Sequence, residues 1–395
     1  MRGTTYGVRD ALDTLTDNAP PPLRTSVEDV VRAGRRLRGR RRLALAGTSL
    51  MAAALAAGFG IPAMVGTGRP GATAGTSATG AAPAPAFPAL DAPFLYSLQG
   101  YSLGKLHVSD PIFATATYQE ATVTLDGVPK LVEENSAGTW RREYDRPVGI
   151  LTVYRPGVFR PARFQAGTAV QVHGRPGLLA EFDATVYDVS PAGKGKLNRP
   201  GTTTHHTVKA PALAWQYADG AWATIVTNPQ YRTADPTGDL LALAGGLAPG
   251  EVRAARVPYR FGTVPAGYHL IGVGSFDPAG AVDDISEAYF SKAAVPVTGL
   301  TDRVDMETVA DSAGGLKIIV AETAPAAPSD PYPHPNPNHP CQPGFCDRAI
   351  NAGYFAETLL GSGSTSLLRG ITDSLVFDDP AAPSTWHPAG DLGTS

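Results

Sequence analysis

A 24-residue stretch without a charged side chain, residues 43–66, constrains this chain more than any other feature. It reads LALAGTSLMAAALAAGFGIPAMVG, and about 20 apolar residues in a helix can cross the ~30 Å hydrocarbon core of a bilayer. A block of arginines lies directly before it, comprising Arg35, Arg36, Arg38, Arg40, Arg41 and Arg42. Because arginine beside a span is retained on the cytoplasmic side, the pattern predicts a single transmembrane helix with a cytoplasmic N-terminus and an extracellular C-terminal region.

Two other interpretations of this stretch remain open. A cleaved export signal would also combine a basic run, an apolar segment and small residues such as those at 54–56. A buried helix of a soluble domain is the second alternative. The 42-residue leader is much longer than the basic region of a usual signal, so we expect a retained anchor whose arginine flank contacts membrane lipid.

Charge is distributed unevenly between the two sides of the arginine block. Residues 1–42 contain ten arginines and five acidic residues, whereas the remainder contains 23 basic and 31 acidic residues. This negative balance argues against nucleic-acid binding by the large region. The basic tail could dock on a cytoplasmic regulator, or its arginine face could meet anionic lipid headgroups.

Beyond residue 66, the composition and hydrophobic pattern of the chain change once. Residues 67–92 are rich in Gly, Ala, Thr and Pro without an apolar period, which is typical of a disordered linker. From residue 93 onward, short runs of β-branched and aromatic residues are interrupted by Gly and Pro. We therefore predict an α+β fold of extracytoplasmic antiparallel β-sheets, each with a helix packed on one face. The expected parts are a module at 93–250, a second at 251–388 and a flexible C-terminus at 389–395.

The clearest local unit combines a hairpin and a helix. Residues 212–226 form two aromatic-rich runs around Ala218-Asp219-Gly220, a favourable hairpin turn. Asp235 then caps a predicted helix at 236–247 with one apolar face. A similar order recurs near the C-terminus, where a strand at 353–360 precedes a predicted helix at 365–377. The recurrence suggests two related modules, each with its helix on a sheet.

Aromatic residues of the hairpin are the candidate ligand contacts. Trp215, Tyr217 and Trp222 could line a groove on the sheet, because aromatic faces bind apolar ligands or sugars. The alternative is that the tryptophans pack in the core, with Trp215 and Trp222 differing in burial. Adjacent His205-His206 is expected in a solvated loop, since neighbouring side chains on a strand face opposite ways and could not easily share one ion.

Only two cysteines exist, Cys341 and Cys346, and the predicted topology places both outside the cell. A pair this close in an oxidising compartment is expected to form a disulfide. A metal site with His334 and His339, or free thiols, are the alternatives. No nucleophile elbow, phosphate loop or calcium loop is present, so we expect neither enzymatic activity nor a cofactor nor a metal.

Several segments together resemble a known group of proteins. These are the tail, arginine block and Ala-rich span, the run from Leu213 to Leu247, PYRFGTVPAGYHL at 258–270, and ITDSLVFDDPAAPSTW at 371–386. They look like actinobacterial single-pass membrane-anchored proteins of uncharacterised function, whose extracytoplasmic part resembles the sensor region of some anti-sigma factors. The resemblance implies a non-catalytic sensor or binding module that regulates a cytoplasmic partner such as a sigma factor. An envelope scaffold or carrier that binds an apolar ligand without signalling is the alternative.

Overall fold

The computed structural model describes residues 87–88, 90, 92–134, 141–189, 203–228, 231, 233–262, 266–275, 284–312, 314–323 and 341–393. The arginine block, the uncharged stretch at 43–66, and both His334 and His339 lie outside these residues. Within the described ranges, no helix combines the length and apolar character needed to cross a membrane. The prediction of an anchor at 43–66 therefore stays a prediction.

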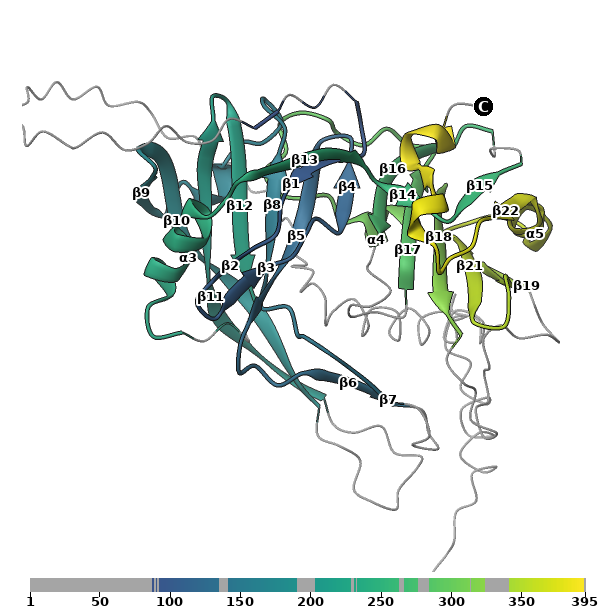
Figure 1. Ribbon diagram of the computed structural model, residues 1–395, viewed down its shortest axis with the longest axis horizontal. Helices are drawn as coiled ribbons and strands as arrows, with labels where there is room; N and C mark the ends of the chain where they lie inside the picture. The colour runs from purple at the N-terminus through teal and green to yellow at the C-terminus, as the bar shows by residue number, and fades with distance from the viewer. Residues whose placement is uncertain are drawn as a thin grey trace, which may run out of the picture. The chain divides into compact units, whose positions relative to one another are not determined.

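Most described strands belong to one 15-stranded sheet in which every pairing is antiparallel. Figure 1 shows it running from β9 at the left to β19 at the right. Its first half comprises β2 (Tyr101–Leu103), β3 (Leu106–Val108), β4 (Phe113–Thr115), β5 (Tyr118–Leu125), β8 (Gly149–Tyr154), β9 (Thr168–Val172), β10 (Arg175–Val189), β11 (Thr203–Ala218) and β12 (Ala221–Thr227). Its second half comprises β16 (His269–Ser275), β17 (Asp284–Ser291), β18 (Gly315–Glu322), β19 (Cys341–Gln342), β20 (Phe345–Ala349) and β21 (Tyr354–Leu360).

Smaller elements complete the described fold. Four two-stranded sheets pair β1 (Leu95–Leu98) with β13 (Pro249–Ala254), β6 (Leu131–Glu134) with β7 (Arg141–Tyr144), β14 (Arg256–Val257) with β23 (His387–Pro388), and β15 (Tyr259–Phe261) with β22 (Leu375–Phe377). The α-helices are α3 (Pro236–Gly245), α4 (Met306–Asp311) and α5 (Thr365–Ser374). Short 3-10 turns occur at η1 (Ala162–Phe164), η2 (Pro383–Thr385) and η3 (Ala389–Gly393). The predicted β-rich, antiparallel character is confirmed.

Local signals in the sequence place several elements correctly. The predicted hairpin joins β11 to β12, and Gly220 in its turn has a φ of 66°, which glycine adopts without strain. Helix α3 begins after Asp235, whose carboxylate accepts a hydrogen bond of 2.9 Å from the Gly238 amide. Ser364 caps α5 in the same way, through the Leu367 amide. These features follow from local hydrogen bonding and backbone sterics, which sequence patterns record directly.

The two halves differ from the separate sheets that we predicted, because one sheet runs through both. Three residues of β4 pair with residues 272–274 of β16 and join the halves. In addition, β13 spans residue 250, where we placed a domain boundary, and pairs with β1. Pairings between strands this far apart in sequence have no local signature, so the pattern of strands does not reveal them.

Three further segments take a different form from the one predicted. The helix beginning at Thr365 ends at Ser374 rather than at residue 377, because Leu375–Phe377 pairs with β15 instead. Ala389 and Leu392 are buried although we predicted a flexible C-terminus at 389–395. His205 and His206 lie within strand β11 rather than in a loop. In each case a tertiary contact overrides the local pattern.

Each half of the sheet has its own apolar core and its own helix. Helix α3 packs on β9 and β11, with Leu240 and Leu243 against Leu213 and Ile225. Helix α5 lies along β19, β20 and β21 and buries Leu368 and its neighbour Ile371 (Figure 1). A third cluster covers the opposite face of the first half, where the chain between β17 and β18 crosses the sheet, and it extends into the second half through Ile271 and Tyr289. The fold thus gives the first half two covered faces.

Replacing the cap residue, as Asp235→Ala, is expected to lower the free energy of unfolding by about 1 kcal/mol, because the Gly238 amide loses its acceptor. Urea unfolding monitored by circular dichroism measures the change. Thr237→Ala, at the exposed second position of the same helix, is the matched control and should change stability by less than about 0.5 kcal/mol. Equal losses in the two variants would contradict the assignment of Asp235 as the cap.

Candidate functional site

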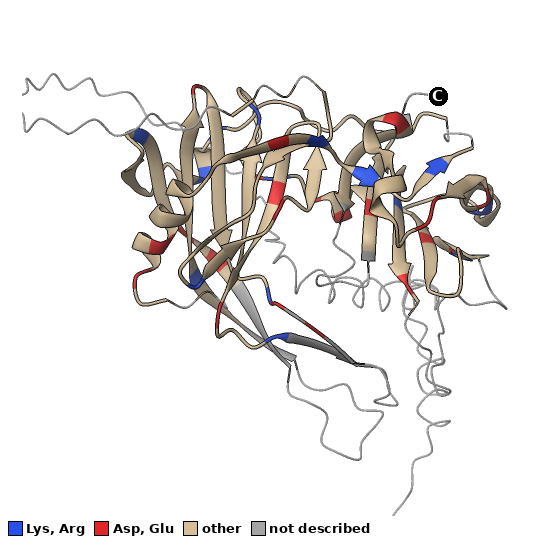
Figure 2. Ribbon diagram, viewed as in Figure 1, with Lys and Arg blue, Asp and Glu red and all other residues tan. Residues whose placement is uncertain are grey.

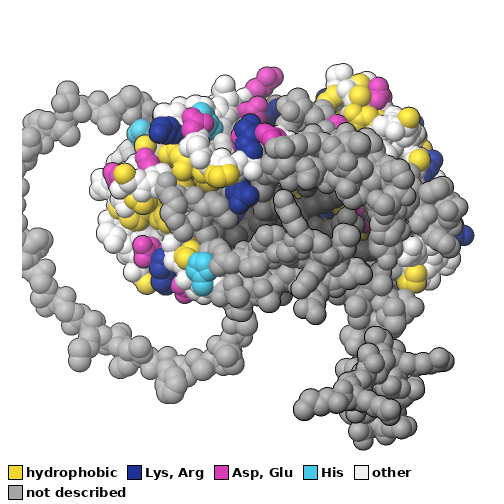
Figure 3. Space-filling model, turned by 90° about the horizontal axis from the view of Figure 1, so that it is seen from below, with side chains coloured by type: hydrophobic (Ala, Val, Ile, Leu, Met, Phe, Trp, Pro, Cys, Tyr) yellow, Lys and Arg dark blue, Asp and Glu magenta, His cyan; other side chains and the backbone are white. Residues whose placement is uncertain are grey.

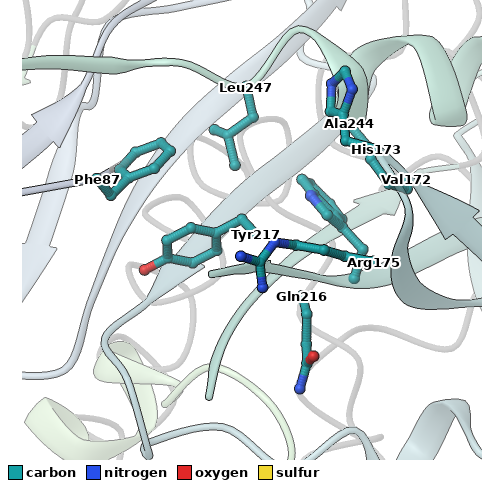
Figure 4. A pocket seen from close by; sticks show the side chains of 9 residues that line it. Phe87, Val172, His173, Arg175, Gln216, Tyr217, Ala244 and Leu247 are labelled. Carbon is teal, nitrogen blue, oxygen red and sulfur yellow. The ribbon is translucent and has the colours of Figure 1, made fainter. Parts of the chain in front are cut away.

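A small aromatic cavity lies beside the β9–β10 turn and the end of α3. Its volume is about 20 Å³, and it is lined by Phe87, Val172, His173, Arg175, Trp215, Gln216, Tyr217, Ala244 and Leu247. Figure 4 shows Phe87 and Leu247 on one side, His173 and Val172 on the other, and Tyr217 and Arg175 below them in this view. A cavity of this size holds about one water molecule, whereas pockets for drug-sized ligands measure roughly 300–1,000 Å³. In this form the cavity is closed to larger ligands.

Strand periodicity decides which of the predicted groove residues meet. Trp215 and Tyr217 are two positions apart on β11, so both side chains lie on the face covered by α3. Trp222 pairs with Gln216 and therefore belongs to the opposite face, where its ring lies 6.4 Å from that of Phe159. The cavity thus contains Trp215 and Tyr217 but not Trp222. Trp215 is 1% exposed and Trp222 only half-buried, the difference in burial that the hairpin suggested.

One wall of the cavity comes from the turn between β9 and β10. His173 and Gly174 have φ values of 49° and 76°, as in the two-residue turns that match the twist of a hairpin. The His173 Nε2 atom lies 2.9 Å from the Gly245 carbonyl oxygen, so this nitrogen carries the hydrogen. Arg175 donates from Nη1 to Asp219 Oδ1 at 2.7 Å. We did not single out His173 or Arg175 from sequence, although the pair His-Gly between two strand candidates is a usable turn signal.

The tyrosine hydroxyls at this site act as neutral hydrogen-bond donors. Tyr217 donates to the Tyr154 carbonyl oxygen at 2.7 Å, and burial raises the pKa of Tyr217 above its ordinary value. Tyr101 donates to the Leu243 carbonyl oxygen at 2.6 Å and ties α3 to β2; burial likewise raises the pKa of Tyr101. Phenols that stay protonated fix geometry and do not exchange protons near neutral pH. The arrangement therefore suits binding.

The remaining wall is Phe87, which belongs to the chain that enters the sheet. Its ring lies edge-on to that of Tyr217, with 4.8 Å between the centroids. Arg155 holds the same stretch of chain, donating to the Leu90 carbonyl at 3.3 Å and also to the Ala92 carbonyl. Phe87, Leu90 and Ala92 fall within 67–92, the range predicted to be a disordered linker. At its sheet end, this linker is held against the domain.

Simple energetics indicate that this attachment is weak. An aromatic pair contributes about 0.5–1.5 kcal/mol beyond burial, and a hydrogen bond from a charged group about 1.5–3 kcal/mol. Ordering the backbone opposes these gains by about 1–2 kcal/mol for each residue fixed. Burial of the Phe87 side chain adds up to about 1.5–3 kcal/mol. The gains and the ordering cost are of the same order, so the net free energy of attachment is a small difference between opposing contributions.

A second polar cluster lies in the other half, between α4 and the sheet. Lys317 Nζ is 2.6 Å from Glu307 Oε1 and 3.0 Å from Glu287 Oε1. The Tyr289 hydroxyl oxygen lies 2.6 Å from an oxygen of each carboxylate, and its one hydrogen is donated to either of them. Burial, reinforced by the two carboxylates, raises the pKa of Tyr289 well above its ordinary value. Because every charged group has a partner of opposite sign, the cluster is a structural link between α4, β17 and β18.

Glu120 forms the corresponding polar contact in the first half. Its Oε2 atom lies 3.3 Å from Arg303 Nη1, and the neighbouring Val304 amide and carbonyl both bond to the Tyr118 hydroxyl. Burial raises the pKa of Glu120, while Arg303 opposes that rise. Asp302 of the same crossing segment pairs with Arg163. Charged contacts therefore hold the segment between β17 and β18 onto the first half of the sheet.

The predicted disulfide is confirmed. Cys341 and Cys346 are bonded across the β19–β20 hairpin, and Cys346 is fully buried. Among the described residues, no group of three His, Cys, Asp or Glu side chains is arranged to hold a metal ion. Charged residues of the described part occur in both halves of the sheet (Figure 2). In the space-filling view, hydrophobic side chains gather at the end of the sheet where β9, β10 and α3 lie (Figure 3).

No protein-family model and no curated protein matches the sequence. Among solved structures, the chain is similar to MucB in a crystal structure of its complex with MucA(peri), at 9% identity and a TM-score of 0.17. It is also similar to the Pseudomonas aeruginosa MucA/MucB complex, at 11% identity and a TM-score of 0.15. Each match covers 72% of this chain and 93% of the other. Similarity at these TM-scores carries no argument about fold or function.

Proposed function

We propose that this chain is a non-catalytic, membrane-anchored sensor or binding module. Residues 1–42 would lie in the cytoplasm, residues 43–66 would span the membrane, and the β-rich region would face the outside. One observation carries the proposal: the chain that leads from the uncharged stretch into the sheet also closes the aromatic cavity, through Phe87. A ligand or partner that alters this contact would alter the path of the chain toward the membrane.

The regulatory half of the proposal assigns a partner to the tail. Movement of Phe87 into or out of the cavity would change the conformation of residues 1–42. These residues would act on a cytoplasmic regulator such as a sigma factor. Support comes from the arginine block beside an uncharged stretch and from the resemblance to anti-sigma-factor sensor regions. This proposal assigns the β-rich region no catalytic step; the cavity lining offers one phenol, Tyr217, and an arginine that pairs with Asp219.

A scaffold or carrier for an apolar ligand is the second candidate, favoured by the aromatic lining. The volume of about 20 Å³ opposes it in the closed form, because an apolar cargo would need a far larger space. Under this proposal ligand binding would leave the tail unaffected. Crosslinking between residues 1–42 and a purified sigma factor, with and without displacement of Phe87, separates the two.

The topology is tested with reporters fused after Asp110 in the otherwise complete chain. Alkaline phosphatase should be active and a green fluorescent reporter dark, because only the former matures outside the cytoplasm. An epitope at residue 1 should stay with the membrane fraction after washing in high salt, as expected of a retained span. A dark phosphatase fusion beside a bright fluorescent fusion, or an intact protein found in the soluble fraction, would contradict the proposal.

A further inference from the structure

The contact between the entering chain and the sheet has the form of a peptide bound in a groove. Phe87 inserts an aromatic ring beside Tyr217, Trp215 and Leu247. Downstream, Arg155 donates hydrogen bonds to the main-chain carbonyl oxygens of Leu90 and Ala92. An aromatic pocket followed by a donor for carbonyl oxygens can recognise any extended peptide that presents the same two features.

The contacts of Phe94 show the point up to which the entering chain, residues 87–92, could detach from the sheet. Phe94 is 6% exposed, and its amide and carbonyl bond to Thr115 and Ala255 at 3.2 and 2.8 Å. The chain is therefore anchored at Phe94. Upstream of it, the described contacts are the packing of the Phe87 ring in its pocket and the two carbonyl groups bound by Arg155. None of these is a strand pairing, so Phe87 can leave its pocket without breaking the strands.

The residues that form the groove are held in place by contacts that do not involve Phe87. Tyr217 is held through its hydroxyl by the Tyr154 carbonyl, one residue before Arg155 in the chain. Trp215 below it is buried in the core under α3. Because the floor stays in place when Phe87 leaves, a vacated pocket keeps its shape and can accept another aromatic ring.

We infer that the groove from Tyr217 to Arg155 is a binding site for an extended peptide that carries an aromatic residue, and that Phe87 is its competing internal occupant. This inference rests on the binding role proposed above and gives that role a ligand class and a means of regulation. A separate peptide can bind only after Phe87 has left the pocket. Binding therefore changes the conformation of the chain at the start of the β-rich region. The apparent affinity for the added peptide falls with the fraction of molecules in which the pocket is free.

The test uses the full-length protein in detergent and a fluorescein-labelled peptide, Phe-Pro-Ala-Leu-Asp-Ala, which copies residues 87–92. Fluorescence polarisation gives its dissociation constant. Phe87→Ala should bind the peptide about fivefold or more tightly than the unaltered protein, because the internal competitor is gone. Phe87→Leu, which keeps an apolar side chain without the aromatic contact, should fall between the two.

Three comparisons make the result decisive. A peptide with Ala in place of its Phe should bind neither protein, and Phe377→Ala, which removes an aromatic ring from the other core, should bind like the unaltered protein. Free N-phenyl-1-naphthylamine should not compete if the peptide backbone is recognised. Equal affinity of the unaltered protein and Phe87→Ala, or equal binding of the two peptides, would overturn the inference. Neither result bears on the reporter fusions, so the two proposals fail separately.

Discussion

Replacing Lys317 by methionine is expected to lower the free energy of unfolding by about 3–5 kcal/mol, since removing one partner leaves buried charges uncompensated. Lys317 is 5% exposed and lies between Glu287 and Glu307, with Tyr289 bonded to the same carboxylates. Methionine keeps most of the apolar stem, so the loss reports on charge rather than on packing. Guanidinium chloride unfolding followed by circular dichroism measures it.

A compensated variant separates the lost charge pairing from general damage. Combining Lys317→Met with Glu287→Gln and Glu307→Gln removes all three charges, and this triple variant should regain much of the lost stability. Replacing a whole buried ion pair or triad by well-packed apolar residues of similar volume is often neutral or stabilising, and the triple variant likewise leaves no buried charge unpaired. Lys209→Met, at an exposed pair with Asp183 on the first half of the sheet, should leave the stability close to that of the unaltered protein, because solvent screens this pair. A triple variant less stable than Lys317→Met alone would refute this account of the cluster.

Trp215→Ala is expected to lower the free energy of unfolding by about 3–5 kcal/mol, the range for a large aromatic side chain removed from a core. Trp215 is 1% exposed and packs with Leu213 and Leu243 beneath α3. Its removal would also enlarge the aromatic cavity by taking away its floor. Urea unfolding monitored by circular dichroism measures the loss.

Trp222→Ala is the matched control because it removes the same side chain from the paired strand. Trp222 is half-buried on the opposite face, beside Phe159, and its loss should be clearly smaller. Trp215→Phe, which retains an aromatic ring, should lose an amount of stability between the losses of the two alanine variants. If both alanine variants lost equal stability, the assignment of the two tryptophans to different environments would be wrong.

Parts of the candidate site could be read from sequence and parts could not. The spacing of Trp215 and Tyr217 places them on one face of a strand, and the hairpin turn at Gly220 places Trp222 on the neighbouring strand. The register between these strands decides that Trp222 faces away, and one residue of slip would reverse this. Phe87 could not be foreseen, because a residue in a Pro-rich and Ala-rich stretch has no periodicity that indicates a contact.

The sequence by itself determined the local features: the uncharged stretch after the arginine block, the cap at Asp235, the hairpin turn at Gly220 and the nearness of the two cysteines. Each depends on groups only a few residues apart, whose sterics and hydrogen bonds are the same in any fold. Only the tertiary structure decided that β4 joins β16 in one sheet and that Phe87 closes the aromatic cavity. Those contacts join residues distant in sequence, and their free energy depends on surfaces that exist only once the chain has folded.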